Sequence, residues 1–226
     1  IIVIILVSTA INNNMKNQSN SIRYQNQNSH TSGNNGGFVV TDIVKKPIIY
    51  IYPIEKMDVE VKLGNPQYLS CTYPKYKNGW SVTADVDGTL VDKNTGKNLY
   101  ALYWEGKEVP KNINLKEGFC VKGKDTATFL EEKLSLLGLS DKEAEEFIIY
   151  WLPKMEENNY NYIRFETKEE QDKSMPLEIT PKPDNLIRVM MDWKGLDEKI
   201  EVQEQNLETP IREGYTVVEW GGTEIK

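Results

Sequence analysis

Histidine is almost absent from this chain of 226 residues, and the one example, His30, lies in a polar segment near the start. The rest of the sequence therefore lacks the imidazole that activates the nucleophile in Ser-His-Asp and Cys-His enzymes. It also lacks the ligands of histidine-containing zinc sites such as HExxH. Only carboxylate, lysine or tyrosine chemistry remains for an enzyme.

Cysteine is scarce as well, because Cys71 and Cys120 are the only two. Both lie in strand-like sequence, and a disulfide between them would close a loop of about 50 residues and stabilise the fold by a few kcal/mol. Two buried thiols are the alternative, since two cysteines in a chain of this size do not make a disulfide scaffold. A catalytic thiol is not expected without a histidine beside it.

Basic residues are outnumbered and scattered. The chain has 27 Lys and Arg against 34 Asp and Glu, a net charge of -7. Two of the basic residues, Lys16 and Arg23, precede residue 38, so residues 38–226 have 25 basic and 34 acidic residues, a net charge of -9. No segment gathers the lysines and arginines that a phosphate-binding face needs. We therefore expect no nucleic-acid partner.

Long hydrophobic runs are missing too. The chain opens with seven aliphatic residues, Ile1–Val7, whereas a bilayer span takes about 20. Small residues follow the run, as at the end of a signal peptide or of a membrane anchor, and Ile11 stands where a lipoprotein has cysteine. We expect residues 1–10 to be such a remnant, and the protein to be exported, either secreted or anchored at the outer face of the cytoplasmic membrane.

Residues 11–37 are rich in Asn, Gln, Ser and Gly and have almost no side chains to bury. Such a composition does not offset the entropy lost on ordering, so we predict a disordered tether. Residues 38–226 are numerous enough for a hydrophobic core, and we expect a single domain there.

Alternating apolar and polar residues predict a domain rich in strands. Met57–Leu63 shows this pattern most clearly, and turn sequences such as Asp87-Gly88 favour antiparallel hairpins. We expect strands at 38–40, 46–53, 57–63, 68–73, 80–84, 89–92, 99–104, 160–166, 176–180, 186–193, 200–202 and 215–220.

Helical periodicity occurs in one region, residues 125–137 and 141–158. Asp125 is the expected N-cap of the first helix, and Ser140 with Glu143 forms the S-x-x-E capping box that opens the second. One helical hairpin among many strands predicts an α+β fold, predominantly antiparallel and rich in meanders.

The segment Asp85–Asp92, DVDGTLVD, resembles the nucleophile motif of haloacid-dehalogenase-type phosphatases. Those enzymes carry the motif on a doubly wound parallel sheet with a downstream Mg²⁺ motif, neither of which this sequence predicts. We interpret Asp87-Gly88 as a hairpin turn. An irregular Ca²⁺ site of Asp85, Asp87 and Asp92 is the alternative, although the spacing excludes an EF-hand. No other cofactor is expected.

Three tryptophans each adjoin an acid. The pairs are Trp104-Glu105, Asp192-Trp193 and Glu219-Trp220. Indole faces stack on sugar rings, so Trp104, Trp193 and Trp220 are candidate ligand-binding residues, and two of the acids facing each other would suit glycoside hydrolysis. Strand alternation explains the pairs equally well, with tryptophan inward and acid outward. The same two interpretations apply to the tyrosines at 50, 52, 73, 76, 100 and 103.

Four landmarks resemble an uncharacterised family of bacterial exported proteins, mostly from Gram-positive organisms. They are Lys46–Pro53 (KPIIYIYP), Leu102–Gly106 (LYWEG), Glu145–Pro153 with its FIIYWLP ending, and Val217–Glu224 (VVEWGGTE). The resemblance runs from residue 46 to the end of the chain and implies one domain. The family has no established activity, so it implies no site residue.

Together these features favour a non-catalytic binding or interaction module at the cell surface, with an extracellular polysaccharide or a protein as partner. The membrane is expected to be contacted only through the N-terminal segment, and no catalytic residue is predicted. The alternative is a carboxylate-based hydrolase acting on cell-wall polysaccharide or another extracellular polymer, recognisable by two acids about 5 to 9.5 Å apart in a cleft.

Overall fold

The computed structural model describes residues 38–113 and 115–225, which belong to one unit of the chain. The predicted remnant at residues 1–10 and the predicted tether at 11–37 lie outside the described residues. The strands are β1 (Phe38–Tyr52), β2 (Met57–Leu63), β3 (Leu69–Tyr73), β4 (Trp80–Ala84), β5 (Leu90–Asp92), β6 (Asn98–Leu99), β7 (Leu102–Ile113), β8 (Glu117–Lys122), β9 (Tyr160–Phe165), β10 (Leu177–Thr180), β11 (Asn185–Leu196), β12 (Gln203–Glu204) and β13 (Thr216–Glu224). The helices are α1 (Thr126–Leu136), α2 (Asp141–Met155) and α3 (Lys168–Ser174), with short 3-10 turns η1 (Pro66–Tyr68) and η2 (Gly123–Asp125).

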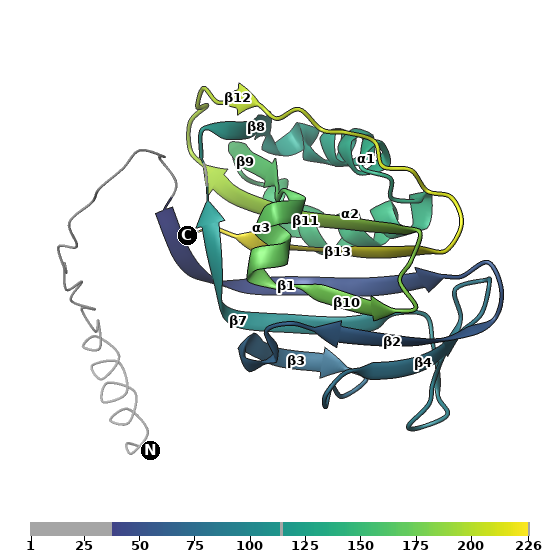
Figure 1. Ribbon diagram of the computed structural model, residues 1–226. Helices are drawn as coiled ribbons and strands as arrows, with labels where there is room; N and C mark the ends of the chain where they lie inside the picture. Colours follow the sequence, from purple (N-terminus) through teal and green to yellow (C-terminus); the bar gives the residue numbers. More distant parts are fainter. Residues whose placement is uncertain (1–37, 114, 226) are drawn as a thin grey trace, which may run out of the picture. The chain divides into compact units, whose positions relative to one another are not determined.

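The strands form two sheets (Figure 1). The large sheet has eight strands in the order β12-β8-β9-β11-β13-β1-β7-β3, and the small sheet has five in the order β10-β2-β4-β5-β6. Most neighbours pair antiparallel, as predicted, whereas β11 pairs parallel with β13, and β12 with β8. The α+β class, rich in antiparallel strands and with a helical hairpin, is confirmed.

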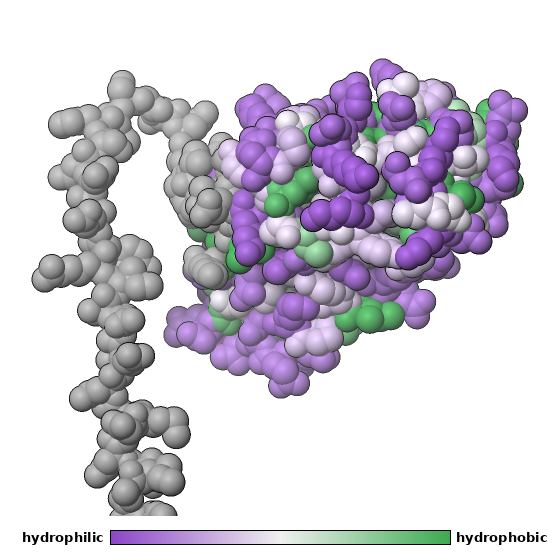
Figure 2. Space-filling model, turned by 90° about the horizontal axis from the view of Figure 1, so that it is seen from below, coloured by the Kyte–Doolittle hydropathy of each residue, from purple (hydrophilic) through white to green (hydrophobic). Residues whose placement is uncertain are grey.

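Hydrophobic side chains cover both faces of the large sheet. On one face, Leu130, Phe147 and Trp151 of the helical hairpin pack on strand residues such as Ile163 and Val218. The opposite face meets the small sheet and α3, so the domain has three layers (Figure 1). The surface seen from below is mostly hydrophilic, with hydrophobic residues in small separated groups, as the acidic composition predicts (Figure 2).

The helical hairpin ends close to its predicted limits. Ser140 and Glu143 make the predicted capping box, in which each side chain bonds to the backbone amide of the other residue. Asp125 stands at the N-cap of α1, as predicted, but its side chain makes no capping hydrogen bond. Within residues 38–113 and 115–225, no helix has the length and apolar character needed to cross a membrane.

Helix α3 was not predicted, because its sequence, KEEQDKS, has no apolar stripe. Its signal was a second capping box, Thr167 with Glu170, which the structure contains. The predicted strand at 200–202 is also wrong, since the chain pairs at β12 instead. Residues 197–215, called the strap here, cross the edge of the large sheet and pass α1 (Figure 1).

The DVDGTLVD segment forms the predicted hairpin turn between β4 and β5. The Asp85 amide donates to the Thr89 carbonyl at 2.9 Å, and Gly88 adopts φ 84°, a conformation that glycine reaches without strain. This meander of short antiparallel strands is unlike the parallel sheet that the phosphatase motif requires.

Candidate functional site

The three tryptophans predicted to bind ligand are buried in the core, so that prediction is wrong. Trp104, Trp193 and Trp220 are each at most 2% exposed. Trp104 belongs to the core between the two sheets, while Trp193 and Trp220 belong to the core under the helices. They cannot form one surface platform, because they lie on opposite faces of the large sheet.

The acids beside these tryptophans are also separated by the sheet. Glu219 is buried on the side of the small sheet, where it accepts hydrogen bonds from Trp104 Nε1 at 2.8 Å and Arg188 Nε at 2.7 Å. Asp192 faces the same side, whereas Glu105 faces the side of the helices and pairs with Lys45 at 3.1 Å. Glu105 therefore makes no hydrolytic pair with either of the other two.

Each of the three aspartates considered for calcium binding already has a nearby side chain or backbone amide as partner. Asp85 pairs with Lys56 at 3.4 Å, and Asp87 Oδ1 accepts from the Thr89 amide at 2.8 Å, both in the β4–β5 turn. Asp92 lies at the other end of β5, where Thr95 donates to it at 2.5 Å. The part of the chain that the structure describes contains no cluster of three or more His, Cys, Asp or Glu residues placed to hold a metal ion.

Of the two alternatives for the cysteines, the disulfide is not formed, because Cys71 and Cys120 are both free, and Cys71 is exposed. Cys71 lies on β3 and Cys120 on β8, six strand positions apart in the large sheet. Six spacings of about 4.8 Å put them roughly 29 Å apart, far beyond the reach of about 7 Å between bridged Cα atoms.

An aromatic surface lies beside α2, and all but one of its tyrosines are among those for which the ligand-binding and the core interpretations were both open. The helices cover one end of the large sheet, and strands β1, β7 and β3 continue the same face beyond α2. Tyr73 and Tyr103 are directly paired across β3 and β7 on this face. We call this surface the tyrosine face, and its rings are those of Tyr50, Tyr52, Tyr73, Tyr100, Tyr103 and Tyr150. The signal was present in KPIIYIYP, where tyrosines alternate with apolar residues.

The rings of the tyrosine face are ordered by their neighbours. Tyr50 and Tyr52 are parallel within 2°, with centroids 6.3 Å apart, and Tyr100 lies 6.3 Å from Tyr50. The Tyr50 hydroxyl donates to Glu146 at 2.5 Å. Burial first, and this carboxylate second, raise the pKa of Tyr50 above its ordinary value, so the phenol stays neutral at physiological pH. Tyr73 and Tyr100 present their rings to solvent, each 55% exposed.

Two lysines reach this face because β1 carries a bulge. The register shifts between Lys45 and Ile48, and Lys46 has φ 60°, a left-handed conformation rare for a side-chain-bearing residue. Lys45 pairs with Glu105, while the Lys46 ammonium lies 5.7 Å from the Tyr103 ring centroid and 5.6 Å from that of Tyr150. Rings, carboxylates and ammonium groups are thus interleaved on one surface.

The strap is tied to the edge of the tyrosine face by a buried ion pair. Glu143 accepts from Arg212 Nη1 at 2.7 Å and Nη2 at 2.8 Å, and from the Tyr52 hydroxyl at 2.7 Å. Burial acts to raise the pKa of Glu143, but the guanidinium, the Ser140 amide and the Tyr52 hydroxyl outweigh it and hold that pKa below the ordinary value. Glu143 is therefore a charged anchor between α2, β1 and the strap.

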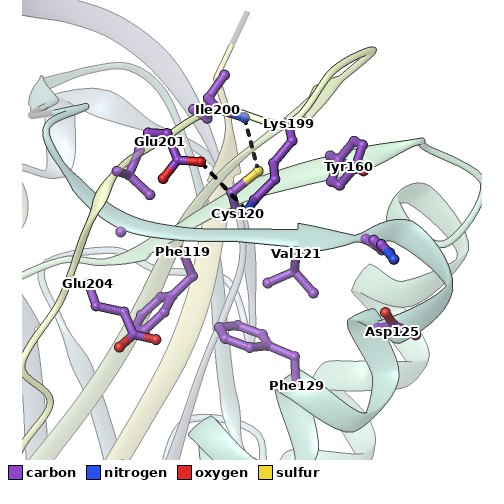
Figure 3. Close-up of a pocket in the computed structure, with 13 residues that line it drawn as sticks. Phe119, Cys120, Val121, Asp125, Phe129, Tyr160, Lys199, Ile200, Glu201 and Glu204 are labelled. Atoms are coloured by element: carbon purple, nitrogen blue, oxygen red, sulfur yellow. Dashed lines mark hydrogen bonds and ion pairs between the residues drawn. The ribbon is translucent and has the colours of Figure 1, made fainter.

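A second candidate is the hollow of about 850 Å³ between β8 and the strap (Figure 3). Cys120 points toward the strap, where the Ile200 amide donates to its sulfur at 3.4 Å, and Phe119 and Phe129 point to the other side of β8. Lys199 and Glu201, both on the strap side of this hollow, pair with each other at 3.6 Å. Two of its polar side chains, Lys199 and Glu201, are paired with each other, and Phe119, Val121 and Phe129 also line it without any set of rings gathered on one face, so we take the tyrosine face as the stronger candidate.

No family model, curated protein or solved structure matches this chain. The resemblance to a family of exported proteins therefore stays a prediction. Any function has to come from the chemistry of the site itself.

Proposed function

We propose that the domain is a non-catalytic binding module of the cell surface that holds a polysaccharide chain against its tyrosine face. The observation that carries the proposal is the gathering of six tyrosine rings on one face, with Tyr73 and Tyr100 about half exposed. The cell-surface part rests on the N-terminal sequence, whose apolar run and polar tether are typical of an exported protein.

Tyrosine suits a sugar ligand because it combines an apolar ring with a polar tip. The C–H faces of a pyranose can lie on the exposed rings of Tyr73 and Tyr100. Around them, the Lys142 ammonium, 5.4 Å from the Tyr100 ring centroid, and the Glu105 carboxylate offer a donor and an acceptor to sugar hydroxyls. An extended, open surface of this kind fits a polymer better than a small molecule, which is usually enclosed in a pocket.

Binding without cleavage is favoured by the way the acids of the face are used. Glu146 accepts from Tyr50, and Glu105 pairs with Lys45, so both carboxylates hold neighbouring side chains in position. A glycosidase needs one acid free to protonate the leaving group and another free to attack or activate water.

The test is to incubate the full-length protein with insoluble cell-wall polysaccharide and with soluble polysaccharides, then to measure retention and the release of reducing ends. Retention without release is expected. Release of reducing ends would replace the proposal with the carboxylate-based hydrolase. Absence of retention on every polysaccharide would overturn the polysaccharide ligand and turn attention to a protein partner.

A further inference from the structure

A lysine is buried between two carboxylates beneath α3, on the opposite side of the large sheet from the tyrosine face. Lys111 of β7 contacts Asp192 Oδ1 of β11 and Glu166 Oε1, at the end of β9. The three side chains are 3%, 1% and 3% exposed, respectively. Lys111 Nζ also donates to Thr223 Oγ1 at 2.7 Å. Lys111 and Asp192 are 81 residues apart in the chain, so their meeting is a product of the fold.

The two oxygens of Asp192 have different partners. Oδ1 faces the Lys111 amine, whereas Oδ2 accepts from Arg164 Nη1 at 3.1 Å. Arg164 is itself held by Glu170 of α3, at 2.7 and 2.8 Å. The Lys111 nitrogen, a nucleophile once it has lost a proton, therefore lies against one side of the Asp192 carboxyl group. The Arg164 guanidinium lies on the other side, where negative charge develops when a carbonyl is attacked.

The protons needed for a condensation are also present. Burial above all, together with the charges of Asp192 and Glu170, raises the pKa of Glu166 to about 7 even though Lys111 opposes the shift. Burial acts to lower the pKa of Lys111, but the two carboxylates outweigh it, so the resting group is an ammonium. The Lys111 ammonium donates directly to Asp192 Oδ1, so the proton that must leave the nitrogen has only this hydrogen bond to cross.

We propose that Lys111 and Asp192 condense to an intramolecular isopeptide bond, with Glu166 as the catalytic proton carrier. Lys111 Nζ passes one proton to Asp192 Oδ1, and its lone pair then attacks Asp192 Cγ while negative charge moves to Oδ2 beside Arg164. Glu166 donates its proton to Oδ1, which leaves as water as the C=O bond re-forms at Oδ2. The second proton of the Nζ then returns to Glu166. The sum is an ammonium and a carboxylate giving an amide and one water, with no oxidant or reductant.

The surroundings suit this reaction. A cavity of about 10 Å³ lies among Lys111, Glu166, Glu170, Ser174 and Asp192, which is room for about one water molecule. The released water has a place, while bulk water that would favour hydrolysis is kept out by α3.

The chain contains its own control pair. Lys168 and Asp172 of α3 also make a close ion pair, but their side chains are 81% and 42% exposed. Asp172 Oδ1 also lies 3.5 Å from the Arg188 guanidinium, so the control differs from the proposed pair in its exposure and in having no buried acid beside it. Contact and a neighbouring guanidinium are therefore not sufficient in this proposal. Lys168 and Asp172 are expected to stay unlinked.

The test is peptide mapping of the folded full-length protein by mass spectrometry after proteolysis under denaturing conditions. One branched peptide is expected, joining the segments around Lys111 and Asp192 and lighter than their sum by the mass of one water. Asp192→Asn is expected to give the same branch with loss of ammonia instead of water. Lys111→Arg and Glu166→Gln are expected to give separate peptides.

Unmodified Lys111 and Asp192 peptides from the folded wild-type chain would overturn the proposal without any need for a variant. A branch that joins Lys111 to Glu166, or one that joins Lys168 to Asp172, would overturn it as well. The first would make Glu166 the acceptor, and the second would show that burial does not select the pair.

Discussion

Pro47 lies so close to Gly221 that a β-carbon on the glycine would stand 3.0 Å from the proline Cα, Cγ and nitrogen. Pro47 follows Lys46 in the bulge of β1, and Gly221 belongs to β13, the neighbouring strand. The contact therefore connects two landmarks of the sequence, KPIIYIYP and VVEWGGTE. Because Gly221 has no side chain, Pro47 can pack against its backbone and the bulge can form. The bulge in turn brings Lys45 and Lys46 to the tyrosine face.

Replacing Gly221 with alanine should destabilise the domain by about 1–3 kcal/mol, because the new methyl group meets proline backbone that has no room to move. The free energy of unfolding in urea measures this. Gly96→Ala is the matched control, since Gly96 has φ 70° but nothing lies within 4 Å of an added β-carbon. That variant should therefore be destabilised only by the backbone strain energy of about 1–2 kcal/mol. If Gly221→Ala leaves the stability unchanged, the bulge is not held by this contact.

The tyrosine face predicts which residues carry retention on polysaccharide. Tyr73→Ala and Tyr100→Ala should each reduce retention severalfold and together abolish it, with little change in stability, because both rings are about half exposed. Tyr160→Ala is the control, since Tyr160 lines the hollow under the strap. Loss of retention in Tyr160→Ala alone would move the binding site from the tyrosine face to that hollow.

The helical hairpin and most strands were predictable, because their apolar spacing and the Ser140–Glu143 capping box are local signals. The orientation of Trp104, Trp193 and Trp220 was not, because alternation tells which residues share a face but not whether a second layer covers it. Helix α3 has no apolar stripe. Its place is fixed by polar contacts with distant strands, such as that of Glu170 with Arg164.

The buried cluster was beyond prediction for a similar reason. Lys111 sits in the sequence Val-Pro-Lys-Asn, which is typical of a loop, and its partners follow 55 and 81 residues later. Periodicity gives no information about contacts across four strands of a sheet. The tyrosines of β1 were visible in the sequence, but their exposure depends on where α2 ends.

The anchor of the strap gives a stability prediction. Arg212→Met should lower the free energy of unfolding by about 3 kcal/mol, because it leaves the Glu143 carboxylate buried without its cation. Urea unfolding at neutral pH measures the loss. Lys173→Ala is the control, because Lys173 pairs with Glu169 at 3.5 Å in full contact with solvent, and no measurable change is expected there. Equal stabilities of Arg212→Met and wild type would show that water reaches Glu143.

Glu166 predicts a pH dependence of opposite sign to that of most acids. Its pKa is raised from 4.5 to about 7 in the folded chain, where it faces Lys111 of β7, Asp192 of β11, Arg164 of β9 and Glu170 of α3. The folded state then binds more protons than the unfolded state between about pH 4.5 and 7, so this group's contribution to stability falls as pH rises through that window. Glu166→Gln should show a flatter profile than wild type. Parallel profiles would mean that Glu166 titrates normally.

The isopeptide bond predicts a second difference between wild type and Glu166→Gln. It concerns the size of the free energy of unfolding at a fixed pH, whereas the previous prediction concerns how that free energy changes with pH. At pH 5 the folded Glu166 is neutral, so Glu166→Gln changes neither size nor charge there and leaves Lys111 and Asp192 in place. Wild type closes a loop over a separation of 81 residues, which restricts its unfolded chain and is worth about 4–5 kcal/mol in the chain-entropy model. Urea unfolding at pH 5 should therefore show wild type more stable by about that amount. Matching midpoints at pH 5, together with a difference at pH 8, would assign Glu166 a purely electrostatic role and leave Lys111 and Asp192 as an ion pair.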